Sequence, residues 1–136
     1  MTIRLLLACT ALAATAACAV DQEAAARAEA RDLAQVPPAT PVGEPINCLQ
    51  TSLIQQTYTR GDRVIDFRTR NNRIYRNTLP QSCPGLGFDS SFSYRTTANQ
   101  LCAIDTITVL RSGASVPGLT CGLGEFQQVE LTPSAD

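Results

Sequence analysis

Two β-prone runs flank a pair of asparagines in residues 64–78, which read VIDFRTRNNRIYRNT. The first run spans Val64 to Arg70 and the second spans Arg73 to Thr78, and both carry the branched and aromatic residues that favour strands. The Asn71-Asn72 pair between them tolerates the positive φ that a two-residue type I′ turn demands. The segment therefore predicts a β-hairpin.

A two-residue turn would also fix the register of the hairpin. Arg68 would oppose Tyr75 and Asp66 would oppose Asn77, which makes one face polar. The other face would have Arg76 as its one charge. Its remaining side chains would be Ile65, Phe67, Thr69, Ile74 and Thr78. We expect this largely apolar face to be buried, as in a half-buried sheet.

Short runs of the same kind extend to both sides of the hairpin. Gly, Pro, Asn and Asp interrupt them about every ten residues, which is typical of all-β domains. We expect further strands at residues 52–59, 92–96, 103–110 and 124–131, and a loop at residues 79–89. Five or six strands within residues 46–132 predict a small all-β barrel or sandwich, followed by a tail at residues 133–136.

The N-terminus carries an export signal. Arg4 precedes an uncharged run over residues 5–17, which is long enough for the core of a signal peptide. The run is too short to span a bilayer, because a membrane-spanning helix needs about 20 apolar residues. Residues 14–18 read ATAAC and resemble a bacterial lipobox, with Thr15 where Leu is usual. We therefore expect residues 1–17 to be a lipoprotein signal peptide and Cys18 to be lipidated.

The alternative is an ordinary secretory peptide, cleaved after Ala16 or after Ala19. If Cys18 is lipidated, residues 18–45 become the anchor and a tether. Residues 21–35 are rich in Ala, Glu and Arg and predict a marginal helix, and residues 36–45 hold four Pro and should run extended. Since Ala19 follows Cys18, we expect outer-membrane anchoring by lipid on the periplasmic side of the bacterial envelope.

Four cysteines fall in the predicted domain, at positions 48, 83, 102 and 121. An even number in a small exported domain predicts two disulfides, and spacings of 35, 19 and 19 residues contain no CxxC pair that would indicate a metal site. Three pairings are possible. Of these we favour Cys83–Cys102 with Cys48–Cys121.

Several motifs resemble a family of small exported proteobacterial proteins of unknown function. The resemblance covers residues 48–126 and is carried by YRNTLP (residues 75–80), CPGL (83–86), FSY (92–94), LCAID (101–105) and CGLGEF (121–126). It implies a cysteine-bearing exported domain in which the four cysteines form one framework. It implies no activity.

The chain contains no His, and all 11 of its basic residues are Arg. Catalytic units that need imidazole or a lysine amine are therefore excluded. We expect no catalytic residues, no cofactor and no metal site. A carboxylate-based hydrolase is the one enzymatic alternative, since two carboxylates suffice for glycoside chemistry. Its candidate residues are Asp66, Asp89, Asp105 and Glu125.

Six arginines lie within residues 60–76, and two aspartates lower the net charge of that segment to +4. Arginine forks bind phosphate and carboxylate groups. The hairpin would bring Arg68, Arg70 and Arg73 together near its tip, beside Tyr75. We expect these four residues to bind an anion. Export argues against nucleic acid as the ligand, so anionic glycolipids or other anionic envelope polymers are the expected partners. The alternative is a solvated hairpin whose arginines keep an edge strand soluble.

These observations predict a lipid-anchored envelope protein that binds anionic components without catalysis. The alternative function is that of a structural or assembly accessory subunit of an envelope protein complex. Such a subunit would use a sheet face or a strand edge instead of the arginines.

Overall fold

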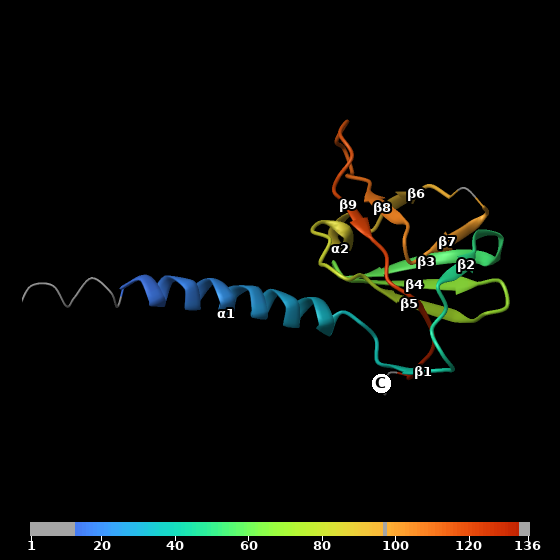
Figure 1. Ribbon diagram of the computed structural model, residues 1–136, viewed down its shortest axis with the longest axis horizontal. Coiled ribbons are helices and arrows are strands. Elements are labelled where there is room, and N and C mark those ends of the chain that lie inside the picture. Colours follow the sequence, from blue (N-terminus) through green and yellow to red (C-terminus); the bar gives the residue numbers. More distant parts are fainter. Residues whose placement is uncertain (1–12, 97, 134–136) are drawn as a thin grey trace, which may run out of the picture. The chain divides into compact units, whose positions relative to one another are not determined.

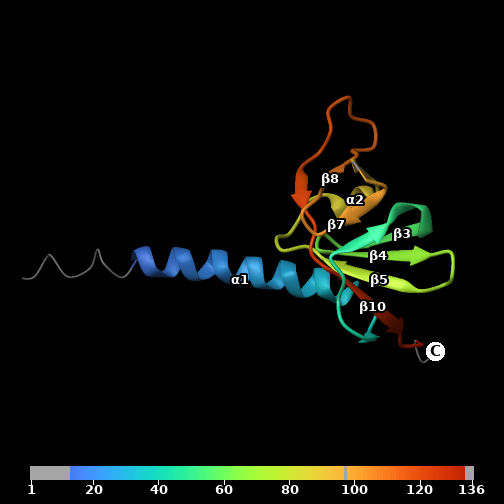
Figure 2. The same ribbon diagram turned by 45° about the vertical axis from the view of Figure 1, so that its right-hand side comes forward.

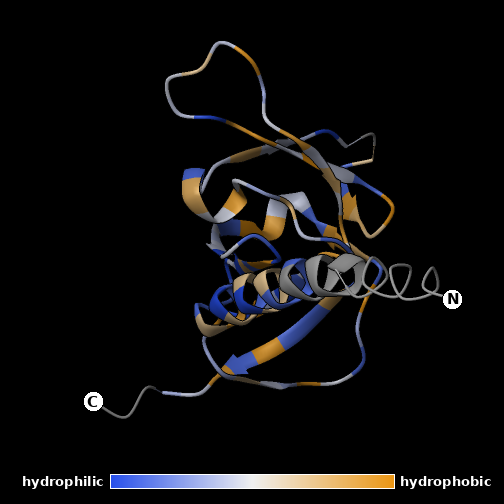
Figure 3. Ribbon diagram, turned by 90° about the vertical axis from the view of Figure 1, so that its left-hand side faces the viewer, coloured by the Kyte–Doolittle hydropathy of each residue, from blue (hydrophilic) through white to orange (hydrophobic). Residues whose placement is uncertain are grey.

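The computed structural model describes residues 13–96 and 98–133 (Figure 1). Most of the predicted signal peptide, residues 1–12, therefore lies outside the described residues. The chain divides into two compact units, residues 1–31 and 32–136. Helix α1 (Ala13–Ala34) fills the described part of the first unit, and an ion pair of 3.5 Å joins Glu23 to Arg27 one turn apart. In Figure 3 hydrophilic and hydrophobic residues alternate along its coloured turns.

Residues 32–136 form an all-β unit, as predicted. Five antiparallel strands form the main sheet, in the order β1 (Ala39–Pro41), β10 (Phe126–Leu131), β5 (Ile74–Thr78), β4 (Val64–Thr69) and β3 (Ile54–Arg60). A second sheet pairs β2 (Cys48–Gln50) with β7 (Gln100–Cys102). A third has the order β6 (Phe92–Tyr94), β8 (Thr106–Val109) and β9 (Thr120–Gly122). The described strands do not form a closed barrel.

Two short helical turns complete the unit, η1 (Thr51–Leu53) and α2 (Leu86–Asp89). Helix α2 lies in the segment predicted as a loop. Figures 1 and 2 show the third sheet and α2 together at one end of the unit, beyond the edge of β3 and β4. The main sheet therefore forms one end of the unit, and the third sheet with α2 forms the other.

The predicted hairpin exists, but its register differs from the expected one by one residue. The Thr69 N–H donates to the Arg73 carbonyl and the Asn72 N–H to the Thr69 carbonyl, both at 2.9 Å, so the loop has three residues. Asn72 supplies the positive φ, at 64°. Asp66 therefore opposes Arg76 instead of Asn77. Because side chains alternate along a strand, this shift exchanges the two faces of β5.

The exchange places Tyr75 and Asn77 on the core side of the sheet and Arg76 on the opposite side. Asn77 is fully buried there and forms a reciprocal pair with Gly124. Its amide donates to the Gly124 carbonyl at 2.6 Å, and its Oδ1 accepts from the Gly124 N–H at 2.9 Å. A Cβ on Gly124 would lie 2.3 Å from the Thr78 carbonyl oxygen, so this close approach requires glycine.

The core lies between the main sheet and the two smaller sheets. Phe67 of β4 meets Phe126 of β10 edge-on, with ring centroids 5.4 Å apart, and Phe92 of β6 at 6.4 Å. Its fully buried aliphatic residues include Ile65, Leu79, Leu86, Leu101 and Ile107. One continuous core therefore joins all three sheets.

Both predicted disulfides are present, but the favoured pairing was wrong. Cys48 bonds to Cys102, and Cys83 bonds to Cys121. The first pair follows from the second sheet, because Cys48 and Cys102 stand directly opposite each other on β2 and β7. The second joins the loop before α2 to β9. Strands β2, β7 and β9 have three residues each, too short for the sequence pattern to indicate.

The Pro-rich segment is partly built into the domain. It was predicted to run extended as part of a tether over residues 18–45, and it does run extended, but β1 within it pairs with β10 at the edge of the main sheet. The Val42 N–H donates to the Gln128 carbonyl at 2.8 Å, and the Thr132 N–H to the Pro38 carbonyl at 2.9 Å. The segment from Pro38 to Val42 is therefore fastened to the sheet.

Candidate functional site

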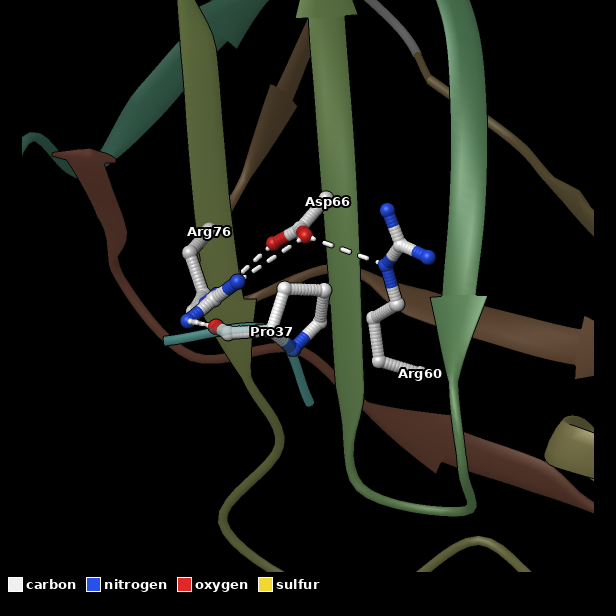
Figure 4. Close-up of polar contacts among 4 residues, drawn as sticks. All are labelled: Pro37, Arg60, Asp66 and Arg76. Carbon is white, nitrogen blue, oxygen red and sulfur yellow. Dashed lines mark hydrogen bonds and ion pairs between the residues drawn. The ribbon is translucent and has the colours of Figure 1, made fainter. Parts of the chain in front are cut away.

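The centre of the main sheet carries a buried charge cluster on the face opposite the core (Figure 4). Asp66 of β4 is buried and accepts from arginines on both neighbouring strands. Its Oδ1 accepts from Arg76 Nε at 2.8 Å, and its Oδ2 accepts from Arg76 Nη2 at 3.0 Å. The third contact, from Arg60 Nε to Oδ2, is 3.3 Å long.

Each of the two arginines also has one further contact nearby. Arg76 Nη1 donates to the Pro37 carbonyl at 3.0 Å, and the Arg60 guanidinium lies 5.1 Å from the centre of the Tyr58 ring. The Arg76 side chain is only 14% exposed, against 27% for Arg60. The two charges are therefore committed to the fold and offer little to a ligand.

The hairpin tip presents arginines differently. Arg68 donates from Nε to Asn72 Oδ1 at 2.9 Å, so its side chain lies along the loop. Arg70 is the first residue of the loop and Arg73 follows its last, and both are exposed. Among the described residues, neither side chain has a hydrogen bond or ion pair with a partner. The tip thus carries two exposed guanidinium groups and a third that is tethered beside them.

The backbone of the tip is held in place. The Thr69 hydroxyl donates to Asn71 Oδ1 and also lies 3.0 Å from the Arg73 carbonyl. The Arg70 N–H donates to the Leu53 carbonyl of η1 at 2.9 Å. Tyr75, by contrast, is half-buried against the core, on the other face of the hairpin from Arg68. The structure therefore brings Arg68, Arg70 and Arg73 to one tip and separates Tyr75 from Arg68.

The candidate carboxylates differ in their surroundings. Asp66 is held by two arginines. Asp89 accepts from the Ser112 N–H at 3.1 Å, and Asp105 Oδ2 accepts from the Cys102 N–H at 2.7 Å. Glu125 is exposed. Within the described part of the chain, no group of three Cys, Asp or Glu side chains could hold a metal ion.

A cavity of about 530 Å³ lies over the third sheet, where no sequence motif indicated a site. Its lining includes hydroxyl side chains from all three strands of that sheet, together with Arg95 and Asp105. Serine and threonine are ordinary residues on the solvent side of a strand. Only the register of the three strands shows that these hydroxyls face one cavity.

Residues 13–96 and 98–133 contain no helix that is both long and apolar enough to span a membrane. Cys18, the predicted lipidation site, falls within α1, and its side chain lies outside the described part of the structure.

The comparisons with known proteins concern the whole chain. No curated protein matches it, and no solved structure matches it. The model of one family of unknown function, DUF6491, matches residues 1–131. This match covers nearly the entire sequence, including both disulfides and the arginine-rich hairpin. The chain therefore belongs to the family of unknown function DUF6491.

Proposed function

We propose that this protein is a non-enzymatic binding module of the bacterial envelope, which contacts anionic envelope components through the tip of the β4–β5 hairpin. The observation that carries the proposal is the unequal use of the arginines. Arg60 and Arg76 are ion-paired with Asp66, whereas Arg70 and Arg73 are exposed and have no carboxylate partner among the described residues. Exposed arginine forks that stand close together suit phosphate groups.

The fixed backbone of the tip supports binding. Hydrogen bonds from Thr69, Arg70 and Asn72 hold the loop before any ligand arrives. A ligand that meets a preorganised loop does not have to order it, so less binding free energy is lost. Arg68, held by Asn72, would supply a third positive charge beside the first two.

Export to the envelope and lipidation at Cys18 are part of the proposal. The two disulfides support it, since they form and persist in oxidising compartments. The signal-like residues 1–17 and the small residues before Cys18 support it as well. Intact mass of the membrane-extracted protein tests it. Lipidation predicts a chain that begins at Cys18 with added acyl mass, whereas a chain that begins at Ala17 or Val20 without acyl mass contradicts it.

The binding test uses the double variant Arg70→Gln/Arg73→Gln. We expect it to bind phosphorylated lipopolysaccharide about tenfold more weakly, because two charge-assisted contacts are lost. The wild-type affinity should also fall with added salt. Arg111→Gln is the matched control, because it removes one exposed charge elsewhere, and it should change the affinity less than about twofold. The proposal would be overturned if the double variant keeps the wild-type affinity, or if the wild-type affinity does not change with salt concentration.

An accessory subunit of an envelope complex is the second candidate function. It is favoured by large apolar side chains that the domain exposes, above all Phe88 at 91%, Ile104 at 92% and Val116 at 70%. A protein partner would remove such surface from water. Crosslinking followed by copurification distinguishes the two functions. A partner that is lost in Phe88→Ser or Ile104→Ser supports the accessory role, and recovery of glycolipid alone supports the binding module.

A further inference from the structure

The third sheet presents a row of hydroxyl groups on its outer face. In the register of its strands, Ser93 of β6 stands opposite Thr108 of β8, and Thr108 stands opposite Thr120 of β9. The Thr108 and Thr120 hydroxyls lie 3.0 Å apart. Residues on the other face of the same strands, such as Ile107 and Val109, are buried in the core. The row therefore faces away from the core across all three strands.

The row forms the floor of the cavity of about 530 Å³. Thr106 adds a fourth hydroxyl, and Pro117 lines the cavity from the long loop that joins β8 to β9, which rises from this end of the domain (Figure 2). Ile104 adds apolar surface and is 92% exposed, whereas Tyr94 stands opposite Ile107, on the other face of the sheet from the row. The volume is in the range of sites that hold small organic ligands, about 300–1,000 Å³.

Arg95 is the one cationic side chain in the cavity lining, which also contains the carboxylate of Asp105. The Arg95 side chain is exposed and, among the described residues, has no hydrogen bond or ion pair. Asp105 lines the same cavity, but its Oδ2 already accepts from the Cys102 N–H at 2.7 Å. No ion pair joins the two side chains in the described structure. Arg95 therefore remains available to bind a carboxylate with both ends of its fork.

We infer that this cavity binds a saccharide that carries a carboxylate. Each Ser or Thr hydroxyl can donate and accept at once, which matches the alternating demands of sugar hydroxyls. Ile104 and Pro117 supply apolar surface for the C–H face of a sugar ring, and Arg95 binds the acid. The site shares no residue with the hairpin tip, so the inference goes beyond the proposed function and does not depend on it.

Calorimetric titration of the full-length protein tests the inference, with digalacturonic acid as the acidic probe. The neutral disaccharide of the same linkage and inorganic phosphate serve as comparison probes. We expect saturable binding of digalacturonic acid and about tenfold weaker binding of the neutral sugar, because one charge-assisted contact is lost. Inorganic phosphate should not compete at equal concentration. No binding of the acid, equal binding of both sugars, or displacement by phosphate would overturn the inference.

Two variants assign the contacts. Arg95→Gln should lower the affinity for the acidic sugar to that for the neutral one and leave the neutral sugar unaffected. Thr108→Val keeps the branched shape of the strand residue and should weaken both sugars several-fold, since it removes one hydroxyl. Arg70→Gln/Arg73→Gln should leave sugar binding unchanged. If Arg95→Gln has no effect, or if the hairpin variant abolishes sugar binding, the cavity is not the site.

Discussion

The middle and the tip of the β4–β5 hairpin use the same side chain in opposite ways. In the middle, Arg76 is 14% exposed and bidentate to buried Asp66. At the tip, Arg70 and Arg73 lie within six residues of Arg76 and are exposed, with no partner among the described residues. The register sets this difference. It places the Asp66 carboxylate opposite Arg76, whereas Arg70 and Arg73 lie at the loop, where no carboxylate stands opposite them.

This contrast teaches that a count of arginines does not measure a binding surface. A charge that is buried with its partner contributes to the stability of the fold by satisfying that partner. Removal of either member is strongly destabilising. An exposed charge at a loop contributes little to stability and is available to a ligand. The net +4 of residues 60–76 therefore overstates what the hairpin offers to an anion.

The largest expected effect comes from Asp66→Ala. The change leaves Arg76 largely buried without its carboxylate, so the free energy of unfolding should fall by about 3–5 kcal/mol. Urea denaturation measures it, and Glu125→Ala, an exposed carboxylate on the same unit, should cost under about 0.5 kcal/mol. The double variant Asp66→Leu/Arg76→Met should recover much of the loss, because it removes both charges. If Asp66→Ala lowers the free energy of unfolding no more than Glu125→Ala does, the arginines in the middle of the hairpin are not used differently from those at its tip.

Gly124→Ala tests the base of the hairpin, where the register was misjudged. The added methyl would press on the Thr78 carbonyl and break the reciprocal pair with Asn77. We expect a loss of about 1–3 kcal/mol in the free energy of unfolding. Gly122→Ala is the matched control, since nothing lies within 4 Å of its Cβ position, and it should be nearly neutral. Equal behaviour of the two variants would show that Asn77 does not hold this register.

Asn72→Ala sharpens the boundary between the two regions. Alanine is strained at a φ of 64° and also removes the partner of Arg68, so the loss should be about 1 kcal/mol. Asn72→Gly tolerates the backbone angle and should lose less stability, while it still releases Arg68. Thermal unfolding of both variants measures the difference. If glycine is as damaging as alanine, backbone strain is not the reason for asparagine here.

The smallest effect on stability is expected for Arg70→Gln/Arg73→Gln. Both side chains are exposed and unpartnered within the described residues, so the free energy of unfolding should change by less than about 0.5 kcal/mol. The same variant is expected to lose affinity for anions. A loss of stability above about 1 kcal/mol, measured in urea, would show that the tip arginines are structural after all.

The all-β class could be predicted, and strands were recognisable where their runs are long and rich in branched residues, as in Val64–Thr69 and Ile74–Thr78. The register could not, because Asn71-Asn72 suits both a two-residue turn and a three-residue loop whose third residue has positive φ. That one-residue difference moved Arg76 from the expected core face to Asp66.

The cysteine pairing and the cavity escaped prediction for a related reason. Both depend on which short strands become neighbours, as Cys48 and Cys102 do on β2 and β7. Three-residue strands carry too few side chains to show a period of two. The hydroxyl row of Ser93, Thr108 and Thr120 likewise exists only through pairing, since its members are widely separated in the sequence.

The attachment of the Pro-rich segment has a mechanical consequence. The Pro37 carbonyl is bound by Arg76, and β1 pairs with β10, so the chain is clamped to the sheet from Pro37 onward. Under the proposed lipid anchoring, residues 37–45 therefore add nothing to the reach of the domain. A described contact lies even nearer to the lipid, where Asp32 Oδ1 accepts from the Asp62 N–H at 2.6 Å. A pull on the anchor would load this Asp32 contact first, and then the β1–β10 hydrogen bonds and the Asp66 cluster. The ion pairs at the centre of the sheet would then help to hold the tether on the domain under load.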